Sequence, residues 1–411
     1  MRRCLYTYII ILCGLFTGLL PSCSKSGDEL TQEEQEEAAV DGPVTVSFEA
    51  KMTTATGSTR AANDINTAAN LATEGGFGVF GCYTGMYRYV DTSVNPNFMY
   101  NEHVSSTDGG IEWTYNPVKY WPNGDGTATG NTGENPHYVS FMAYAPYSDT
   151  ETGAAGYCIP TLSLQGEMSN PWLTYRLHTD VAQQVDLLFA SHTNEHPLLN
   201  LRKPTANTKI PFYFDHALAC VGDRVTIQCS DAMKDNIAAR IGSSGMKIEV
   251  VLTALNITYT LTEKGRLVLW NNGEANWQPI LSGNTVVERT VSLTPGRTIY
   301  LNDGGTVSDE AGAYVGEGYG VYYIPLDLNK NPQKAHISLT YEIRRYTDAS
   351  NYVVERERTT ETTLRLSAYP DAYKGGKHLY FNIDITDVSL LVTAAITNWV
   401  SAGEPTSAIA E

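Results

Sequence analysis

The sequence predicts an all-β protein. Of its 411 residues 42% are hydrophobic, and 26 tyrosines stand among many Thr and Val, the residue types that are enriched in strands. Breaks rich in Gly, Asn, Asp or Pro recur about every ten residues, and long helical apolar patterns are nearly absent. This spacing is typical of β-sandwiches and β-barrels, and the length suits two large β domains or three smaller ones.

The charge balance excludes one class of partner. The chain has 45 acidic and 28 basic residues and a net charge of −17. Nucleic acids need a basic face that neutralises their phosphates, so we expect no nucleic-acid partner. A strongly acidic balance suits a water-facing surface.

The N-terminus has the features of a targeting segment. Arg2 and Arg3 precede an apolar run from Leu5 to Leu20, which is too short for a stable membrane span. The run ends in Leu20-Pro21-Ser22-Cys23, which resembles a bacterial lipobox. The resemblance implies a signal peptide over 1–22 and a lipid on the amine and sulfur of Cys23. The alternative is an ordinary secretory signal in which this cysteine is a coincidence.

The residues after Cys23 predict a disordered tether. The stretch 23–42 is acidic, has no aromatic residues and contains few large apolar ones. An acidic run beside a lipidated cysteine also resembles the export tags of surface lipoproteins in some anaerobic bacteria. We therefore expect a lipid-anchored precursor on the outer face of the outer membrane.

The first strand is predicted over Val44–Met52. Its apolar and polar residues alternate without a miss, which is the pattern of a strand with one buried face. That face consists of Val44, Val46, Phe48, Ala50 and Met52. The next eight residues, TTATGSTR, are small and polar and end in Arg60, so they form a good protease substrate. A cut between Arg60 and Ala61 would separate the strand from its domain; the alternative is a loop arginine beside a permanent strand.

Further strands follow in order, each bounded by turn residues. In the N-terminal half they are predicted over 76–83, 138–145, 185–190, 209–221 and 224–229. A short helix is predicted over 231–245, where we place a domain boundary that divides the chain into 43–235 and 236–411. In the C-terminal half strands are predicted over 247–255, 257–261, 266–270, 285–293, 299–301, 319–325, 335–345, 352–366, 377–385 and 390–400.

Residues with catalytic or metal-binding potential are few. His192 and His196 are four apart but follow a strand and precede a proline, and no motif places a third ligand, so we expect no metal site. His216 lies in an apolar strand, where a hydrogen-bonded core histidine is the simpler interpretation. Nucleophile elbows and phosphate loops are absent from the sequence, so we expect neither an enzyme nor a cofactor.

Cysteines and aromatic residues leave alternatives open. Cys82, Cys158, Cys220 and Cys229 can form one or two disulfides in an oxidising compartment or remain buried thiols. A second group consists of aromatic residues that offer either a sugar-stacking platform or core packing: Trp113, Tyr115, Tyr120 and Trp121. If these aromatic residues form a sugar-stacking platform, the protein is a surface glycan-binding lipoprotein, which is the alternative function.

Several segments together resemble the fimbrillin-like family, the subunits of type V pili. They occur in the family's order across nearly the whole chain: the lipobox with Cys23, VTVSFEAKM with STRAA behind it, GFGVFGCYTG, the aromatic block 113–122, VSFMAYAP, DLLFA, FYFDHALACV, and a terminal FNIDITDVSLLVTAAITNW that ends at Trp399. The ordered set is more specific than any one segment.

The resemblance implies a fold and a mode of assembly. It implies two tandem transthyretin-like β-sandwich domains, no enzyme activity, and a place in the fimbrium at the cell surface. A lipoprotein precursor would be cut by an arginine-specific protease at Arg60–Ala61, lose the strand Val44–Met52, and accept a strand from another fimbrial subunit. The donor segment would be about Leu390–Glu411. Its last residues, SAGEPTSAIAE, are less apolar than a strong donor needs, which leaves a stalk, tip or anchor role open.

Overall fold

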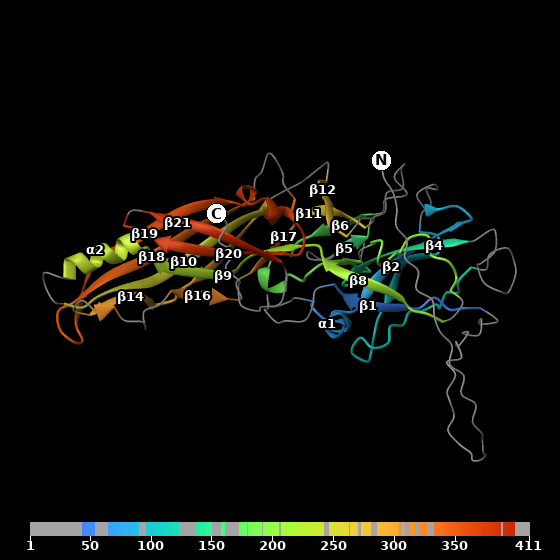
Figure 1. Ribbon diagram of the computed structural model, residues 1–411, viewed down its shortest axis with the longest axis horizontal. Coiled ribbons are helices and arrows are strands. Elements are labelled where there is room, and N and C mark those ends of the chain that lie inside the picture. Colours follow the sequence, from blue (N-terminus) through green and yellow to red (C-terminus); the bar gives the residue numbers. More distant parts are fainter. Residues whose placement is uncertain are drawn as a thin grey trace, which may run out of the picture. The chain divides into compact units, whose positions relative to one another are not determined.

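The strands of the N-terminal half form a six-stranded sheet in the order β1-β8-β7-β4-β2-β3 (Figure 1). The strands are β1 (Phe48–Met52), β2 (Phe77–Gly85), β3 (Met99–Val104), β4 (Tyr138–Ala145), β7 (Leu188–Ala190) and β8 (Ile210–His216). All neighbours are antiparallel except β1, which runs parallel to β8 at one edge.

The computed structural model describes most of the chain beyond the predicted tether. The described residues are 43–53, 65–89, 96–122, 137–149, 158–160, 172–178, 180–190, 192–204, 207–241, 246–262, 264–269, 273–280, 286–303, 306–307, 313–317, 320–326, 333–387 and 389–398. The predicted signal peptide and tether lie outside them. Residues 39–411 form one compact unit.

The central strands of this sheet are buried on both faces. Every residue of β4 is buried, and so are seven of the nine in β2. One face, with Phe77 and Phe141, packs in the same core as β1; the other, with Phe80 and Tyr144, packs in a second core. Burial on both faces explains why these segments are continuously apolar instead of alternating.

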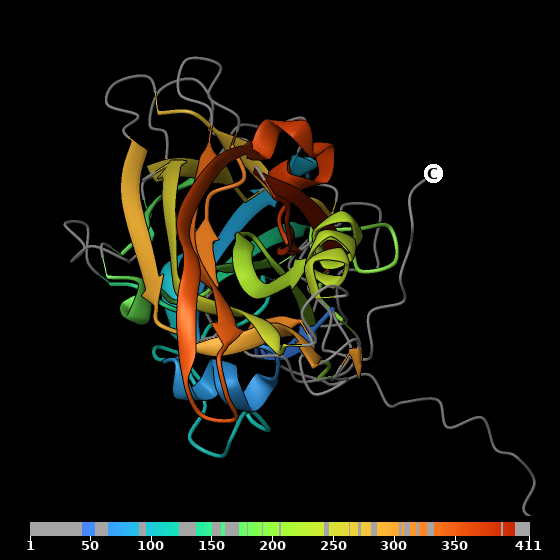
Figure 2. The same cartoon turned by 90° about the vertical axis from the view of Figure 1, so that its left-hand side faces the viewer.

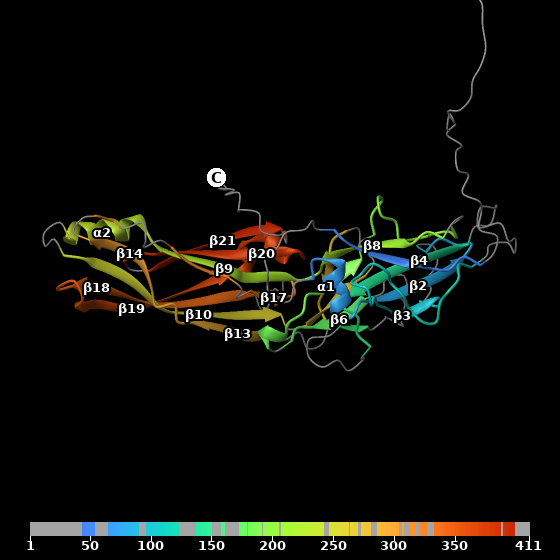
Figure 3. The same ribbon diagram turned by 90° about the horizontal axis from the view of Figure 1, so that it is seen from below.

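The C-terminal half packs two sheets face to face (Figure 3). One sheet has the order β15-β14-β10-β18-β19, with β13 also pairing with β10. Its strands are β10 (Ile248–Thr262), β13 (Val286–Leu293), β14 (Arg297–Asp303), β15 (Thr306–Val307), β18 (Lys334–Tyr346) and β19 (Tyr352–Arg365). The other has the order β16-β9-β20-β21, with β17 also pairing with β9. It contains β9 (Ala219–Cys229), β16 (Tyr314–Glu317), β17 (Val321–Tyr323), β20 (Lys377–Ile385) and β21 (Leu390–Asn398).

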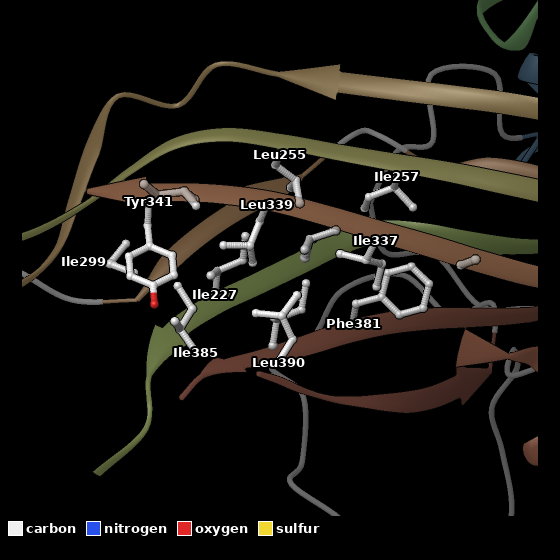
Figure 4. Packing of buried hydrophobic residues seen from close by; sticks show 14 of the residues in the cluster. Ile227, Leu255, Ile257, Ile299, Ile337, Leu339, Tyr341, Phe381, Ile385 and Leu390 are labelled. Carbon is white, nitrogen blue, oxygen red and sulfur yellow. The ribbon is translucent and has the colours of Figure 1, made fainter. Parts of the chain in front are cut away.

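The core between these two sheets is built from alternating residues of both. Leu255, Ile337 and Leu339 project from one sheet toward Ile227 and Phe381 of the other (Figure 4). All five are at most 1% exposed. This is the interdigitation of two inner faces that defines a β-sandwich.

A fourth, smaller sheet joins segments from both halves of the sequence. Its order is β12-β11-β6-β5, and its strands are β5 (Cys158–Pro160), β6 (Trp172–Arg176), β11 (Lys264–Val268) and β12 (Asn276–Gln278). β9 precedes residue 235 but pairs with strands that follow it. The division into domains at 235/236, and the transthyretin-like character of each, stay predictions.

Helices are few in the described part of the chain. They are α1 (Ala68–Thr73), α2 (Asp231–Ile241) and three 3-10 turns, η2 (Val181–Gln183), η3 (Leu366–Ala368) and η4 (Pro370–Tyr373). α2, the yellow-green coil of Figure 2, confirms the helix expected over 231–245. The all-β expectation is therefore confirmed at the level of a mostly β architecture with several sheets.

The apolar run 209–221 is not one strand, as the sequence predicted, but two. β8 ends at His216 and β9 begins at Ala219 in a different sheet. Two hydrogen bonds hold the backbone between them. The Ala217 N–H donates to the Leu187 carbonyl at 2.7 Å, and the Trp277 indole N–H donates to the Ala217 carbonyl at 2.8 Å. These distant partners allow the chain to change sheets without leaving polar groups unpaired in the core.

Candidate functional site

The segment from Val44 to Thr53 lies at the edge of the six-stranded sheet and changes partners halfway. In its first part the Val46 N–H donates to the Lys119 carbonyl and the Trp121 N–H donates to the Val44 carbonyl, both at 2.9 Å. From Phe48 onward it runs parallel to β8, in the register Phe48↔Ile210 to Met52↔Phe214. The two partners together hold the segment along its whole length.

The ends of the parallel pairing are closed by further hydrogen bonds. The Ile210 N–H donates to the Ser47 carbonyl at 2.8 Å. At the other end both the N–H and the hydroxyl of Thr53 donate to the Phe214 carbonyl at 3.0 Å. The backbone groups bonded to the 119–121 strip belong to Val44 and Val46, and those bonded to β8 belong to Ser47 and Thr53. Because successive residues of an extended chain point their backbone N–H and C=O groups to opposite sides, the strip and β8 flank the segment on its two sides.

The alternation predicted a shared buried face, and the structure gives one. Val44, Val46, Phe48 and Ala50 are 0%, 1%, 0% and 6% exposed, and Met52 is half-buried. Burying a Val or Phe side chain contributes about 1.5–3 kcal/mol, so the three large residues contribute about 5–9 kcal/mol as an upper estimate. We call the surface that receives these side chains the seat of the first strand.

Phe48 occupies the most aromatic part of this seat. Its ring centroid lies 5.5 Å from that of Tyr115, 5.7 Å from Phe141 and 5.2 Å from Phe212. Phe141 belongs to β4 and Phe212 to β8, the neighbour of β1 in Figure 3. A single side chain of β1 thus contacts two strands of the sheet and the aromatic block 113–122.

Tyr115 connects that block to the first strand. Its hydroxyl donates to the Val46 carbonyl at 2.7 Å and accepts from the Lys119 N–H at 3.2 Å. Burial raises the pKa of the Tyr115 phenol to about 12. The ordinary value of a tyrosine is about 10, so the neutral phenol is favoured in the folded state.

Replacing Tyr115 with phenylalanine tests this contact through its pH dependence. At pH 8 the variant is expected to lose about 1–3 kcal/mol of unfolding free energy, because the two hydrogen bonds of the hydroxyl are removed. Since the folded-state pKa is raised, the phenol contributes fully below its unfolded pKa of about 10 and its contribution is lost as the pH rises to about 12. Denaturant unfolding should therefore show that the difference in unfolding free energy between the wild type and Tyr115→Phe becomes smaller as the pH rises from about 10 to about 12.

Tyr120→Phe is the matched control for this measurement. Tyr120 is 51% exposed, so its substitution is expected to change the unfolding free energy by less than about 0.5 kcal/mol at either pH. A gap between wild type and Tyr115→Phe that stays constant from pH 8 to pH 12 would contradict the role given to the Tyr115 phenol.

The other predicted processing residues cannot be placed. Cys23, Arg60 and Ala61 lie outside the described residues, as does the end of the predicted donor segment beyond Asn398. The described part of that segment is β21, which lies at one edge of its sheet and pairs antiparallel with β20 over nine residues.

The sugar-stacking platform predicted as an alternative is wrong for its two tryptophans. Trp113 and Trp121 are 5% and 4% exposed and lie in the core of the six-stranded sheet. The Trp113 ring packs on Phe77 at 5.0 Å, and the Trp121 ring meets Phe141 edge-on at 5.9 Å. Neither indole presents a face to a ligand. The sequence did not reveal that this block pairs with Val44–Val46, because its two prolines interrupt any strand period.

The three histidines considered in the sequence, His192, His196 and His216, make structural contacts. The His192 Nδ1 accepts from the Leu198 N–H at 3.0 Å, and the His196 ring stacks on Tyr213 at 3.6 Å. His216 is buried and lies 2.6 Å from the Asp186 carboxylate, which confirms it as a core histidine. Within the described ranges no three His, Cys, Asp or Glu side chains are grouped as a metal site.

Three of the four cysteines considered for disulfides, Cys82, Cys220 and Cys229, are buried and form no disulfide. Burial raises the pKa of the Cys82 and Cys229 thiols to about 12. They are therefore protonated and unreactive at neutral pH.

Helices of the described residues are all too short or too polar to span a bilayer.

Comparison with known proteins shows similarity to fimbrial proteins both in sequence and in fold. No family model matches the chain. The fimbrium subunit Fim1C of Phocaeicola vulgatus is 24% identical over 352 residues, which cover 81% of this chain and 84% of that protein. In fold, the chain is similar to the crystal structure of a fimbrial protein from Bacteroides vulgatus, with a TM-score of 0.61 at 19% identity, over 87% of this chain and 100% of that one.

The match to a fimbrium subunit covers most of both chains, and it agrees with the buried first strand and the ordered segments of the sequence. We conclude that the chain is similar in sequence to a fimbrium subunit and in fold to a fimbrial protein.

Proposed function

We propose that this chain is a fimbrial subunit, made as a lipoprotein precursor, that joins other subunits by strand exchange at the seat of the first strand. In this proposal an arginine-specific protease cuts between Arg60 and Ala61, Val44–Met52 leaves, and a strand of another subunit takes its place. The single observation that carries the proposal is the position of Val44–Met52, an edge strand whose apolar side chains fill the core of its sheet.

The covalent layout supports release of this strand. Residues 54–64 connect Thr53 to Ile65, so a cut at Arg60–Ala61 leaves Val44–Met52 joined only to the residues before it. After the cut, the strand is retained by non-covalent contacts alone. β1 is the last strand in the order of its sheet, so its departure breaks its pairing with β8 and the bonds of Val44 and Val46 to the 119–121 strip, but no pair between other strands of the sheet.

The energetics favour a seat that is refilled by another strand over a seat that stays empty after the first strand leaves. An empty seat would expose Tyr115, Phe141 and Phe212 and would leave backbone groups of β8 and the 119–121 strip unpaired. The side-chain loss alone is about 5–9 kcal/mol. Such a groove favours the addition of an extended chain, since main-chain hydrogen bonds supply affinity and alternate side chains supply specificity.

The donor in this proposal is the C-terminal segment, about Leu390–Glu411. Its described part, β21, alternates as a donor needs: Leu390, Val392, Ala394 and Ile396 pack against the core, and the residues between them face outward. The lipid on Cys23 would hold the precursor at the outer membrane until the cut releases it. Each half would be a transthyretin-like sandwich.

The processing step is tested by Arg60→Ala. The intact precursor, treated with an arginine-specific protease, is expected to give a ladder of oligomers in unboiled gels, with subunits that begin at Ala61. Arg60→Ala should remain monomeric, because its first strand stays attached. Arg88→Ala, which changes an exposed arginine outside the seat, should still form the ladder. A ladder from Arg60→Ala equal to that of the wild type would refute the proposed cut.

A further inference from the structure

An arginine-lined cavity of about 740 Å³ lies in the C-terminal half, beside α2 and the edge strand β19. Its lining includes Arg240 of α2, Arg356 and Arg358 of β19, and Asp387 of the turn between β20 and β21. Ile237 and Ile343, both buried, give it an apolar part. Three guanidinium groups around one cavity are unexpected in a chain with a net charge of −17.

A β-bulge places the two strand arginines there. Ile343 pairs with Arg356 but Arg344 pairs with Val354, so Glu355 is the extra residue of β19. Because paired residues of antiparallel strands share a face, Arg356 stands on the side of the buried Ile343.

Arg358 stands on the same side, opposite the buried Tyr341. Burial raises the pKa of the Tyr341 phenol, while the charges of Arg358 and Arg356 act to lower it, which agrees with both guanidinium groups lying near this face. The edge of β19 is therefore positively charged where it meets the cavity.

Two of these guanidinium groups, those of Arg240 and Arg358, have partners within the protein. Arg240 pairs with Glu355, but Glu355 is shared with Arg345, whose Nε lies 2.5 Å from its carboxylate. Arg358 donates to the backbone carbonyl of Asp387, and the Asp387 carboxylate is bound by the Asn236 amide. The cavity is lined by three guanidinium groups and one carboxylate.

Arg356 differs from the arginines around it. The nearby Arg344 lies 2.7 Å from Glu342 and 3.6 Å from Glu249. Among the described residues, the Arg356 guanidinium makes no hydrogen bond or ion pair. It is exposed and available to a ligand.

We propose that this cavity binds an anionic saccharide, through a sulfate ester or carboxylate held by Arg356 with Arg240 and Arg358. Guanidinium groups bind both kinds of oxyanion through paired, charge-assisted hydrogen bonds. The volume is in the range of small-molecule sites. The proposal is independent of strand exchange, because the seat of the first strand lies in another sheet.

Inward-pointing charges on an edge strand also protect against edge-to-edge aggregation. That explanation accounts for arginines on β19 but requires nothing of Arg240 on α2. The two explanations predict different results for a substitution in α2. If the cavity binds a ligand, the substitution weakens binding; if the arginines only protect the edge strand, it has no effect on binding.

The test is calorimetric titration of the intact chain with a sulfated heparin disaccharide, its desulfated form, which keeps the carboxylate, and a neutral disaccharide. We expect binding of at least one anionic sugar and none of the neutral one, and the better anionic sugar identifies the oxyanion. Arg356→Gln should weaken binding by at least about tenfold, the loss of one charge-assisted hydrogen bond. Arg365→Gln, at the far end of the same strand, should not.

A second variant guards against loss of fold as an explanation. Ala239→Glu, at an exposed position of α2, adds a carboxylate to the cavity and is expected to abolish binding with the denaturant midpoint unchanged. No binding of either anionic sugar at millimolar concentration, or equal affinity of wild type and Arg356→Gln, would overturn the proposal. Equal binding of a poly-glutamate peptide would also overturn it, because the site would then accept any polyanion.

Discussion

Phe48→Ala is expected to lower the unfolding free energy of the precursor by about 3–5 kcal/mol, the usual cost of a buried Phe-to-Ala change. The ring is 0% exposed and contacts Tyr115, Phe141 and Phe212. Its removal leaves a cavity between two strands of the sheet and the aromatic block. Denaturant unfolding should show a lower midpoint with an unchanged slope, since the loss is in stability and not in the extent of unfolding.

Lys51→Ala is the control on the same strand. The Lys51 side chain is 41% exposed, and its ion pair with Glu49 at 3.2 Å lies in water. Exposed pairs of this kind contribute between nothing and about 1 kcal/mol, so the change should be small. If Phe48→Ala costs less than about 1 kcal/mol, the first strand is not an integral part of the core and the proposed exchange loses its driving force.

The first strand was predictable from sequence because its signal is local. A strict alternation of Val44, Val46, Phe48 and Ala50 with polar residues requires one buried face, and these four residues are buried. The neighbours of the strand were not predictable. Its parallel pairing with β8 joins residues about 160 positions apart, and no local pattern specifies such a partner.

The aromatic block shows the opposite case, a strong local signal with the wrong interpretation. Trp113 and Trp121 are large and amphipathic, and such side chains occur both in cores and in sugar sites. What places them in the core is the packing of Phe77 and Phe141 from other strands. Composition alone therefore could not separate a binding platform from a packed layer.

Turn residues also misled the prediction at one position. Gly222 and Asp223 predict a break between two strands, yet β9 runs from Ala219 to Cys229 without interruption. Gly222 has a φ of +77°, and a Cβ there would lie 2.0 Å from the Tyr259 hydroxyl. The glycine permits an irregularity inside a strand, because the register to β20 shifts between Leu379 and Phe381, opposite this part of β9.

The arginine-lined cavity had no signal in the sequence. Arg240 is separated by more than a hundred residues from Arg356 and Arg358, and the bulge at Glu355 that aligns them depends on the register of β18 and β19. Basic residues scattered through an acidic chain give no pattern of spacing. Only the three-dimensional arrangement shows that they surround one space.

The central claim is that the seat of the first strand accepts a replacement once the chain is cut after Arg60, and peptide capture tests it most directly. The cut precursor is mixed with a labelled peptide that copies residues 43–53, and bound label is measured. The account predicts that the peptide binds the cut protein with micromolar or tighter affinity, about 8 kcal/mol or more, and suppresses the oligomer ladder.

Two comparisons make this capture specific. The same peptide with alanine in place of Phe48 should bind at least about a hundredfold more weakly, given the cost of that truncation in the core. The uncut precursor should not take up the peptide, because its own strand occupies the seat. Uptake that is equal in cut and uncut protein, or ladders that persist at saturating peptide, would contradict strand exchange at this seat.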